Sequence, residues 1–220
     1  MKRLLLFILL TSVAATLGYS QAAQKQQIDR YEVNTQKSTM RWTGRSIKGS
    51  HFGTINIKEG MMKVVNDRLV SATFVFDMSS INCNSVPQGV INANIISSLK
   101  AEDFFNASQF PTSTLEIVSV TYRDASKVQI KGFLTIKGIR QPTDFEGTVN
   151  IANNVLEGKA PSIVVSRSNF NLGFNTVGAY EKAADDAVDG NFELKVDITA
   201  NKTNGPVGKT GVQRSGKVIQ

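Results

Sequence analysis

The chain has 220 residues, with 25 lysines and arginines against 18 aspartates and glutamates, and a formal net charge of +7. A single histidine and a single cysteine exclude a His/Cys metal centre within one chain and a framework of internal disulfides. The positive excess lies largely in the Gly-rich end of the chain and not among stacking aromatics, which argues against a nucleic-acid-binding face.

The first 23 residues carry the pattern of a removable signal peptide. Lys2 and Arg3 precede an uncharged run over residues 4–17, which is too short to span a bilayer comfortably. Small residues follow, and cleavage is expected after Ser20, Ala22 or Ala23. The sequence therefore predicts a periplasmic or secreted protein of one domain, with no stable membrane span and a mature net charge of about +5.

Alternation of apolar and polar residues dominates the middle of the sequence. It is cleanest over residues 70–78, 143–151 and 192–198. Weaker strand candidates are residues 38–43, 53–58, 61–65, 114–122, 128–136 and 162–166. Turn signals stand at Glu59-Gly60, Asn66-Asp67, Lys137-Gly138 and Asn153-Asn154. We therefore expect an all-β domain of eight or nine antiparallel strands, which closes into a barrel or stacks as a sandwich.

The inward face of these strands is aromatic and aliphatic. An eight-stranded barrel either fills its interior with such side chains or holds one small ligand there. Pattern alone leaves a packed sandwich and a ligand-holding barrel equally open. The candidate lining residues on the strands are Met40, Trp42, Phe74, Phe76, Phe145, Val149, Phe192 and Leu194.

One segment between Gly89 and Phe105 breaks the strand pattern. Ile91, Ile95 and Leu99 recur at a spacing of four residues, which predicts a short amphipathic helix in a long connection. Such a helix either covers a barrel end or an open edge, or acts as a lid over the mouth of a cavity.

Groups that could carry catalysis are few. Nothing in the spacing pairs His51 with Cys83, and the sequence contains no nucleophile elbow, zinc-protease helix, phosphate loop or dinucleotide-binding fingerprint. The adjacent acids at Glu102-Asp103 and Asp185-Asp186 are typical of solvated loops. We therefore expect no enzyme, no catalytic or metal-binding residue and no cofactor. Cys83 is expected to be an unpaired structural residue, although pairing between two chains, and with it a homodimer, stays open.

Both ends of the mature chain lack a strand or helix pattern. Residues 24–30 are polar and rich in Gln, which predicts a flexible N-terminus. Residues 202–220 contain four glycines and no hydrophobic period, which predicts a disordered basic tail. The predicted domain is therefore residues 31–201.

Several ordered motifs resemble the YceI-like family. In the first half they are residues 42–45 (WTGR), 49–54 (GSHFGT) and 76–81 (FDMSSI), with Gly60 between them. In the second half they are residues 99–105 (LKAEDFF), 109–112 (QFPT) and 132–139 (GFLTIKGI). The resemblance covers about residues 31–200, which is nearly the whole predicted domain.

This resemblance implies an eight-stranded, lipocalin-like antiparallel barrel with a short helical insertion, in a periplasmic or secreted protein. Members of the family hold isoprenoid or quinone-like lipids in the barrel, so an apolar lipid is the implied ligand and no bond is made or broken. The resemblance adds Phe104 and Phe105 to the candidate lining, and Lys100 and Arg167 become candidates for contacting a polar head group. A filled barrel without ligand, acting as a structural or protein-interaction module, remains the alternative.

The chain departs from the family pattern at two places. Ser97-Ser98 stands where the family often has Gly-His, and Ser166-Arg167-Ser168 stands where it often has Asp-Arg-Thr. If either missing group contacts the head of the lipid in other members, head-group preference differs in this chain.

Overall fold

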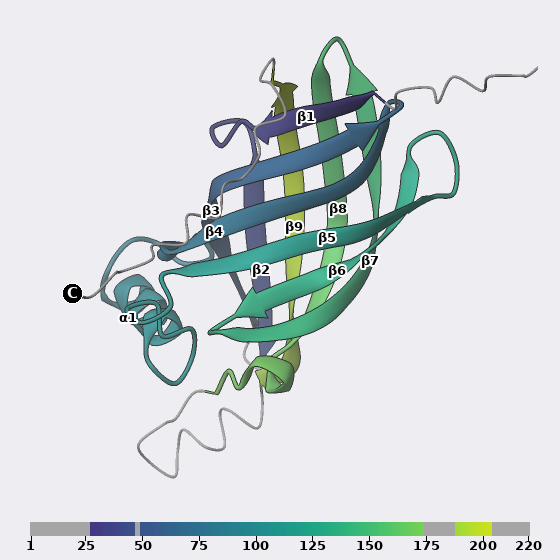
Figure 1. Cartoon of the computed structure of the whole chain (residues 1–220). Coiled ribbons are helices and arrows are strands. Elements are labelled where there is room, and N and C mark those ends of the chain that lie inside the picture. Colours follow the sequence, from purple (N-terminus) through teal and green to yellow (C-terminus); the bar gives the residue numbers. More distant parts are fainter. Residues whose placement is uncertain (1–26, 47–48, 174–187, 204–220) are drawn as a thin grey trace, which may run out of the picture.

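The computed structural model describes residues 27–46, 49–173 and 188–203 (Figure 1). The strands are β1 (Ile28–Val33), β2 (Thr39–Ser46), β3 (Gly49–Val65), β4 (Arg68–Cys83), β5 (Thr112–Tyr122), β6 (Lys127–Ile136), β7 (Ile139–Ala152), β8 (Val155–Ser166) and β9 (Val188–Lys202). The helix α1 (Val90–Lys100) lies between β4 and β5, and a short 3-10 helix, η1 (Ser168–Phe170), follows β8. The predicted signal peptide, residues 1–23, lies outside the described residues, as do residues 204–220 of the predicted tail.

The strands form one antiparallel sheet, which pairing between β3 and β4 closes into a barrel. Within it β1 and β2 occupy a single position. Along β3, β1 pairs with residues 61–65 and β2 pairs with residues 49–55. Both strands also pair with β9 on their other side. The barrel therefore has eight positions, which confirms the predicted eight-stranded barrel and excludes the sandwich.

Three of the predicted turns are confirmed as two-residue hairpins, between β3 and β4, β6 and β7, and β7 and β8. Both central residues of each turn have a positive φ, from 50° to 73°. This backbone matches the right-handed twist of paired strands, and Asn, Asp and Gly adopt it most readily. The pairs are Asn66-Asp67, Lys137-Gly138 and Asn153-Asn154.

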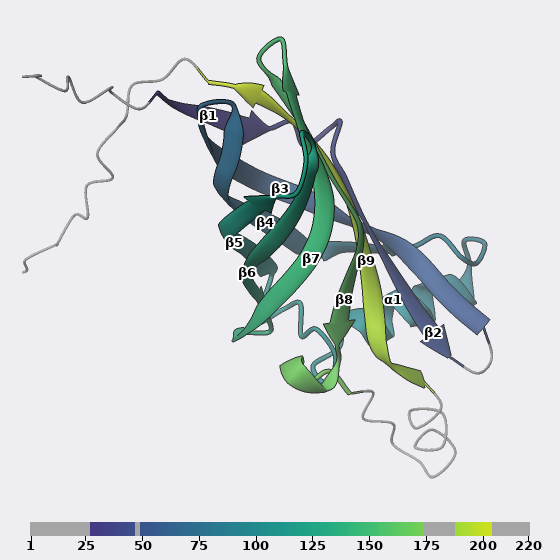
Figure 2. The same ribbon diagram turned by 90° about the vertical axis from the view of Figure 1, so that its right-hand side faces the viewer.

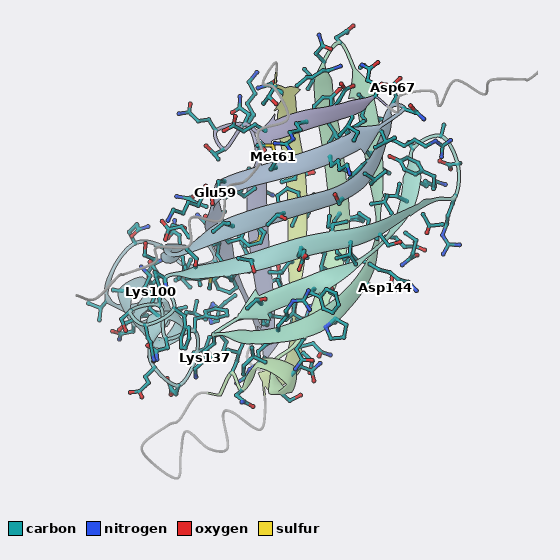
Figure 3. All side chains as sticks on the ribbon, viewed as in Figure 1. Glu59, Met61, Asp67, Lys100, Lys137 and Asp144 are labelled. Carbon is teal, nitrogen blue, oxygen red and sulfur yellow. The ribbon has the colours of Figure 1, made fainter. Side chains whose placement is uncertain are left out.

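The turn predicted at Glu59-Gly60 is wrong, because β3 runs straight through it. Between Ile57 and Glu59, β3 has one more residue than β4, and this β-bulge shifts the inward face by one residue. Glu59 and Met61 consequently lie on the outer face of β3 (Figure 3). Gly60 faces inward, where an added Cβ would lie 2.6 Å from Val33 Cγ2. The glycine thus permits close packing inside a strand.

The predicted helix is confirmed, but its apolar stripe is only partly right. Leu99 is buried, whereas Ile91 is 70% exposed. Asn92 takes an inward position instead, because its Nδ2 donates to the carbonyl oxygens of Cys83, at 2.8 Å, and Val86, at 3.0 Å. Because the polar residue Asn92 holds this face of α1 against the barrel, the apolar periodicity in the sequence does not mark the buried position.

The two ends of the domain are tied together. β1 begins at Ile28 and β9 reaches Lys202, so residues 28–30 and 202 belong to the sheet, where composition suggested flexible ends. The Nζ atom of Lys202 lies 2.8 Å from Oδ2 of Asp29, and Thr203 N donates to the carbonyl oxygen of Arg30.

Candidate functional site

The interior of the barrel contains a cavity of about 40 Å³. Its wall is built by inward side chains of seven strands, β3 to β9. All of the lining residues except Thr148 and Lys159 are apolar. They are Met62, Leu69, Phe74, Leu115, Ile117, Ile130, Phe145, Thr148, Val149, Leu156, Gly158, Lys159, Ala160, Ile163, Val196 and Ile198. Such a wall offers burial to an apolar group and almost nothing to a polar one.

Gly158 keeps part of this space open. It occupies an inward position of β8 between Leu156 and Ala160, both of which are buried. A Cβ added at Gly158 would lie 3.8 Å from Ile198 Cβ and 3.9 Å from Leu156 Cδ2, which are ordinary contacts. A larger side chain at this position would therefore extend into the cavity.

Figure 1 shows α1 beside one end of the barrel, and aromatic rings from the segment after α1 and from β9 pack together there. The ring centroid of Phe105 lies 4.6 Å from that of Phe104 and 6.1 Å from that of Phe192, both in edge-to-face geometry. Leu99 of α1 belongs with these rings to the buried core of the barrel. Trp42 donates its indole N–H to the carbonyl oxygen of Asn82 at 3.0 Å. The interior thus has a mainly aliphatic part around the cavity, which includes Phe74 and Phe145, and an aromatic part near α1.

All ten predicted lining residues are buried in one core cluster, none more than 9% exposed. Phe74, Phe145 and Val149 line the cavity. The other seven belong to the core around it or to the aromatic end: Met40, Trp42, Phe76, Phe104, Phe105, Phe192 and Leu194.

Most of the aliphatic wall was missed by reasoning from sequence. Met62, Ile117 and Ile130 lie in segments whose weak alternation could have identified them. Leu156 and Gly158 gave no signal, because the first half of β8 was not predicted as a strand.

The two head-group candidates lie near the α1 end and do not line the cavity. Arg167 is 8% exposed, its Nε donates to the carbonyl oxygen of Leu172 at 3.2 Å, and its guanidinium carbon lies 5.5 Å from the centre of the Phe104 ring. Lys100 is the half-buried last residue of α1 (Figure 3). In this conformation Arg167 fastens the segment after β8, and contact of either residue with a head group stays a prediction.

Tyr122 bridges β5 and β4 beside the cavity, beyond the point where their ladder ends. The ladder between β4 and β5 ends at Ala72 and Ile117, and beyond it Leu69 N donates to the Tyr122 hydroxyl at 2.9 Å. Burial of the phenol raises the pKa of Tyr122. The guanidinium carbon of Arg68 lies 4.7 Å from the centre of the Tyr122 ring. The Tyr122 hydroxyl thus accepts the hydrogen bond of the Leu69 N–H group at a point where the main chain of β5 no longer pairs with β4.

His51, Ser85 and Cys83 come together, although their spacing gave no sign of it. The Ser85 hydroxyl lies 3.0 Å from His51 Nδ1 and 3.3 Å from Cys83 Sγ, so it stands between an exposed imidazole and a buried thiol. Nowhere in the described part of the chain, here included, do three His, Cys, Asp or Glu side chains gather as a metal site would require. No helix within the described ranges has the length and apolar character needed to cross a membrane.

Comparison with known proteins gives one family. A model of the YceI-like domain matches residues 31–200. The solved structure of BcnA from Burkholderia cenocepacia is 19% identical, covers 77% of this chain and 99% of its own, and has a TM-score of 0.63. A polyisoprenoid binding domain from Saccharophagus degradans, described as implicated in plant cell wall breakdown, is 9% identical, covers 79% and 98%, and has a TM-score of 0.59. At these identities the two structures show a shared fold. No curated protein matches the chain.

Proposed function

Because this chain belongs to the YceI-like domain family, we propose that it is a binding protein that holds an apolar lipid chain inside its barrel. The observation that carries the proposal is the cavity, whose wall is apolar except at Thr148 and Lys159. Burial of apolar surface is the interaction that such a wall provides, and it requires no reacting group. The proposed activity is therefore holding or carrying, with no bond made or broken.

The proposed ligand is an isoprenoid or quinone-like lipid, and the proposed location is the periplasm or the medium. Support for the ligand comes from the Saccharophagus degradans domain, which is named for polyisoprenoid binding and has this fold. Support for the location comes from the signal pattern in residues 1–23. The many branched side chains of the wall suit the branched methyl groups of an isoprenoid.

The size of the cavity sets a condition on this proposal. An apolar cavity of about 150 Å³ holds a benzene ring, and the cavity here measures about 40 Å³. The wall must therefore move outward as a chain enters. Burial of apolar groups contributes about 0.8 kcal/mol per methylene, which offsets the cost of that rearrangement for a long chain.

Native mass spectrometry of the protein purified from the organism that makes it, followed by solvent extraction, tests the proposal. We expect a bound species whose mass matches an isoprenoid lipid released by the solvent. Empty protein that also fails to bind added isoprenoids would contradict it.

A matched pair of variants tests whether the lipid binds in the cavity. Gly158→Leu fills the cavity, whereas Glu157→Leu adds the same side chain at the exposed neighbouring position of β8. We expect the first variant to lose most of the bound lipid and the second to keep it. Equal lipid content in both variants would show that the lipid binds elsewhere.

The small volume favours one other candidate, a filled barrel that acts as a structural or protein-interaction module. Its interior would keep the same volume whether or not lipids are present. A structure determined after incubation with an isoprenoid separates the two, because an unchanged cavity of about 40 Å³ supports the filled barrel.

A further inference from the structure

The strands β7 and β8 separate along half of their length. Their ladder runs from Ala152 and Val155 at the hairpin to Thr148 and Lys159, and ends there. Residues 139–147 of β7 then pair only with β6, and residues 160–166 of β8 pair only with β9, within the ranges that the structure describes. Figure 2 shows β7 curving away from β8 in this region. We call the facing edges of residues 139–147 and 160–166 the seam.

The sequence explains why the seam begins where it does. At Gly147 the strands still touch, since an added Cβ would lie 2.6 Å from the carbonyl oxygen of Lys159. Pro161 follows shortly on β8 and has no N–H to donate to β7. Between Ala160 and Ile163, β8 also has one residue more than β9, and this β-bulge bends the strand away.

The cavity lies behind the beginning of the seam. Half of its lining residues come from β7 and β8. Three of these, Phe145, Ala160 and Ile163, belong to the separated halves of the strands, and they are 7%, 7% and 3% exposed. Phe145 on β7 and Ile163 on β8 are therefore buried side chains of the cavity wall that flank the seam.

Other boundaries of the barrel are fastened more firmly. The α1 end is closed by the cluster of Phe104, Phe105 and Phe192. The interruption between β4 and β5 is bridged by the hydrogen bond from Leu69 N to Tyr122. Near the far end of the seam, Gln141 Nε2 of β7 donates to the carbonyl oxygen of Asn169 at 3.0 Å, but Asn169 belongs to η1 and not to β8.

We propose that the seam is the entrance to the cavity, and that an apolar chain passes sideways between β7 and β8 when Phe145 and Ile163 part. This inference rests on the proposed function, because it concerns the same cavity. Opening the seam breaks no ladder hydrogen bond among the described residues, whereas parting paired strands breaks several. On the β8 side, Val164 is 65% exposed and offers apolar surface beside the entrance.

Two variants that remove the same atoms from different parts of the cavity wall test the entrance. Ile163 and Ile130 both line the cavity and are 3% and 5% exposed, but only Ile163 lies at the seam. Stopped-flow fluorescence with N-phenyl-1-naphthylamine measures the association and dissociation rates of an apolar dye. We expect Ile163→Ala to raise both rates on the order of tenfold relative to Ile130→Ala, because truncation removes a side chain that must move. The pair Ile163→Val and Ile130→Val repeats the comparison with a smaller perturbation if either alanine variant fails to fold.

The outcomes separate the entrance from the site itself. If the wild-type protein binds the dye and the two variants give equal rates, the entrance lies elsewhere while the lipid-binding proposal stands. If neither the dye nor isoprenoids bind to the wild-type protein, the proposed function fails and the entrance fails with it.

Discussion

Asp29 and Lys202 join the first and last described strands of the barrel through an ion pair of 2.8 Å. The hydrogen bond from Lys202 holds the pKa of the Asp29 carboxyl below its usual value, and the carboxylate raises the pKa of Lys202. The pair lies where Tyr31 of β1 meets β9. We therefore expect the stability of this corner of the barrel to depend on pH.

The first prediction concerns Asp29→Asn. A lowered folded pKa contributes stability that is present above the unfolded pKa of aspartate, about 3.9, and is lost as pH falls through the folded value. We expect the variant to lower the free energy of unfolding at pH 7, and the difference from wild type to disappear as the pH falls below about 4. Urea unfolding at several pH values measures it. Glu32→Gln is the control, since Glu32 is an exposed acid of the same strand with no ion pair among the described residues. A pH-independent difference would contradict the linkage.

The second prediction contrasts two glycines near the cavity. Gly158→Ala places a methyl group at ordinary contact distance, so we expect stabilisation of about 1 kcal/mol from burial and reduced freedom of the unfolded chain. Gly147→Ala forces a Cβ to 2.6 Å from the carbonyl oxygen of Lys159, and we expect a loss of about 1 to 3 kcal/mol. Chemical denaturation of both variants measures the two effects. Equal changes would show that the strands near Gly147 adjust freely.

The third prediction concerns the fastening of α1. Asn92→Ala leaves the carbonyl oxygens of Cys83 and Val86 without their buried donor, which costs about 2 to 3 kcal/mol. Asn94→Ala, at an exposed position of the same helix, is the control and is expected to change stability by less than about 0.5 kcal/mol. Thermal unfolding of the two variants makes the comparison. If Asn92→Ala behaves like its control, the helix is held by Leu99 and its neighbours alone.

The fourth prediction concerns the bridge made by Tyr122. Tyr122→Phe removes the acceptor of the Leu69 N–H group but keeps the ring beneath Arg68, and we expect a loss of about 1 kcal/mol. Tyr122→Leu removes the ring as well and should cost more. Hydrogen exchange of the Leu69 amide gives a local readout, since its protection should fall in both variants. Unchanged protection in Tyr122→Phe would show that another group holds this amide.

The alternation of apolar and polar residues predicted the strands that have one solvent-exposed face and one buried face. The alternations over residues 70–78, 143–151 and 192–198 correspond to β4, β7 and β9. The hairpin turns followed from residues that accept a positive φ. By contrast, the sequence predicts two separate strands where the structure has the single strand β3. The β-bulge before Glu59 interrupts the alternation, and Glu59-Gly60 has the composition of a turn.

The candidate site depended on relationships that a local pattern does not contain. Part of the cavity stays open because Gly158 lies opposite Ile198 on the neighbouring strand β9, a pairing that no local pattern contains. The seam depends on where two ladders end, and Pro161 alone did not reveal it. The sequence predicts aromatic residues as the lining of the cavity. Phe104, Phe105 and Phe192 instead pack against one another, because large rings fill the interior at the end of the barrel.

The shared position of β1 and β2 has a consequence for the order of folding. Both strands pair with β9 on their second side, so the first two strands of the barrel complete their pairing only when the last described strand is present. A nascent chain that lacks residues 188–202 has no partner for the free edges of β2 and β8, and exposed edges favour association between chains. Completion of the barrel therefore requires β9, and we expect a molecule shortened within β9 to aggregate and not to fold into a smaller barrel.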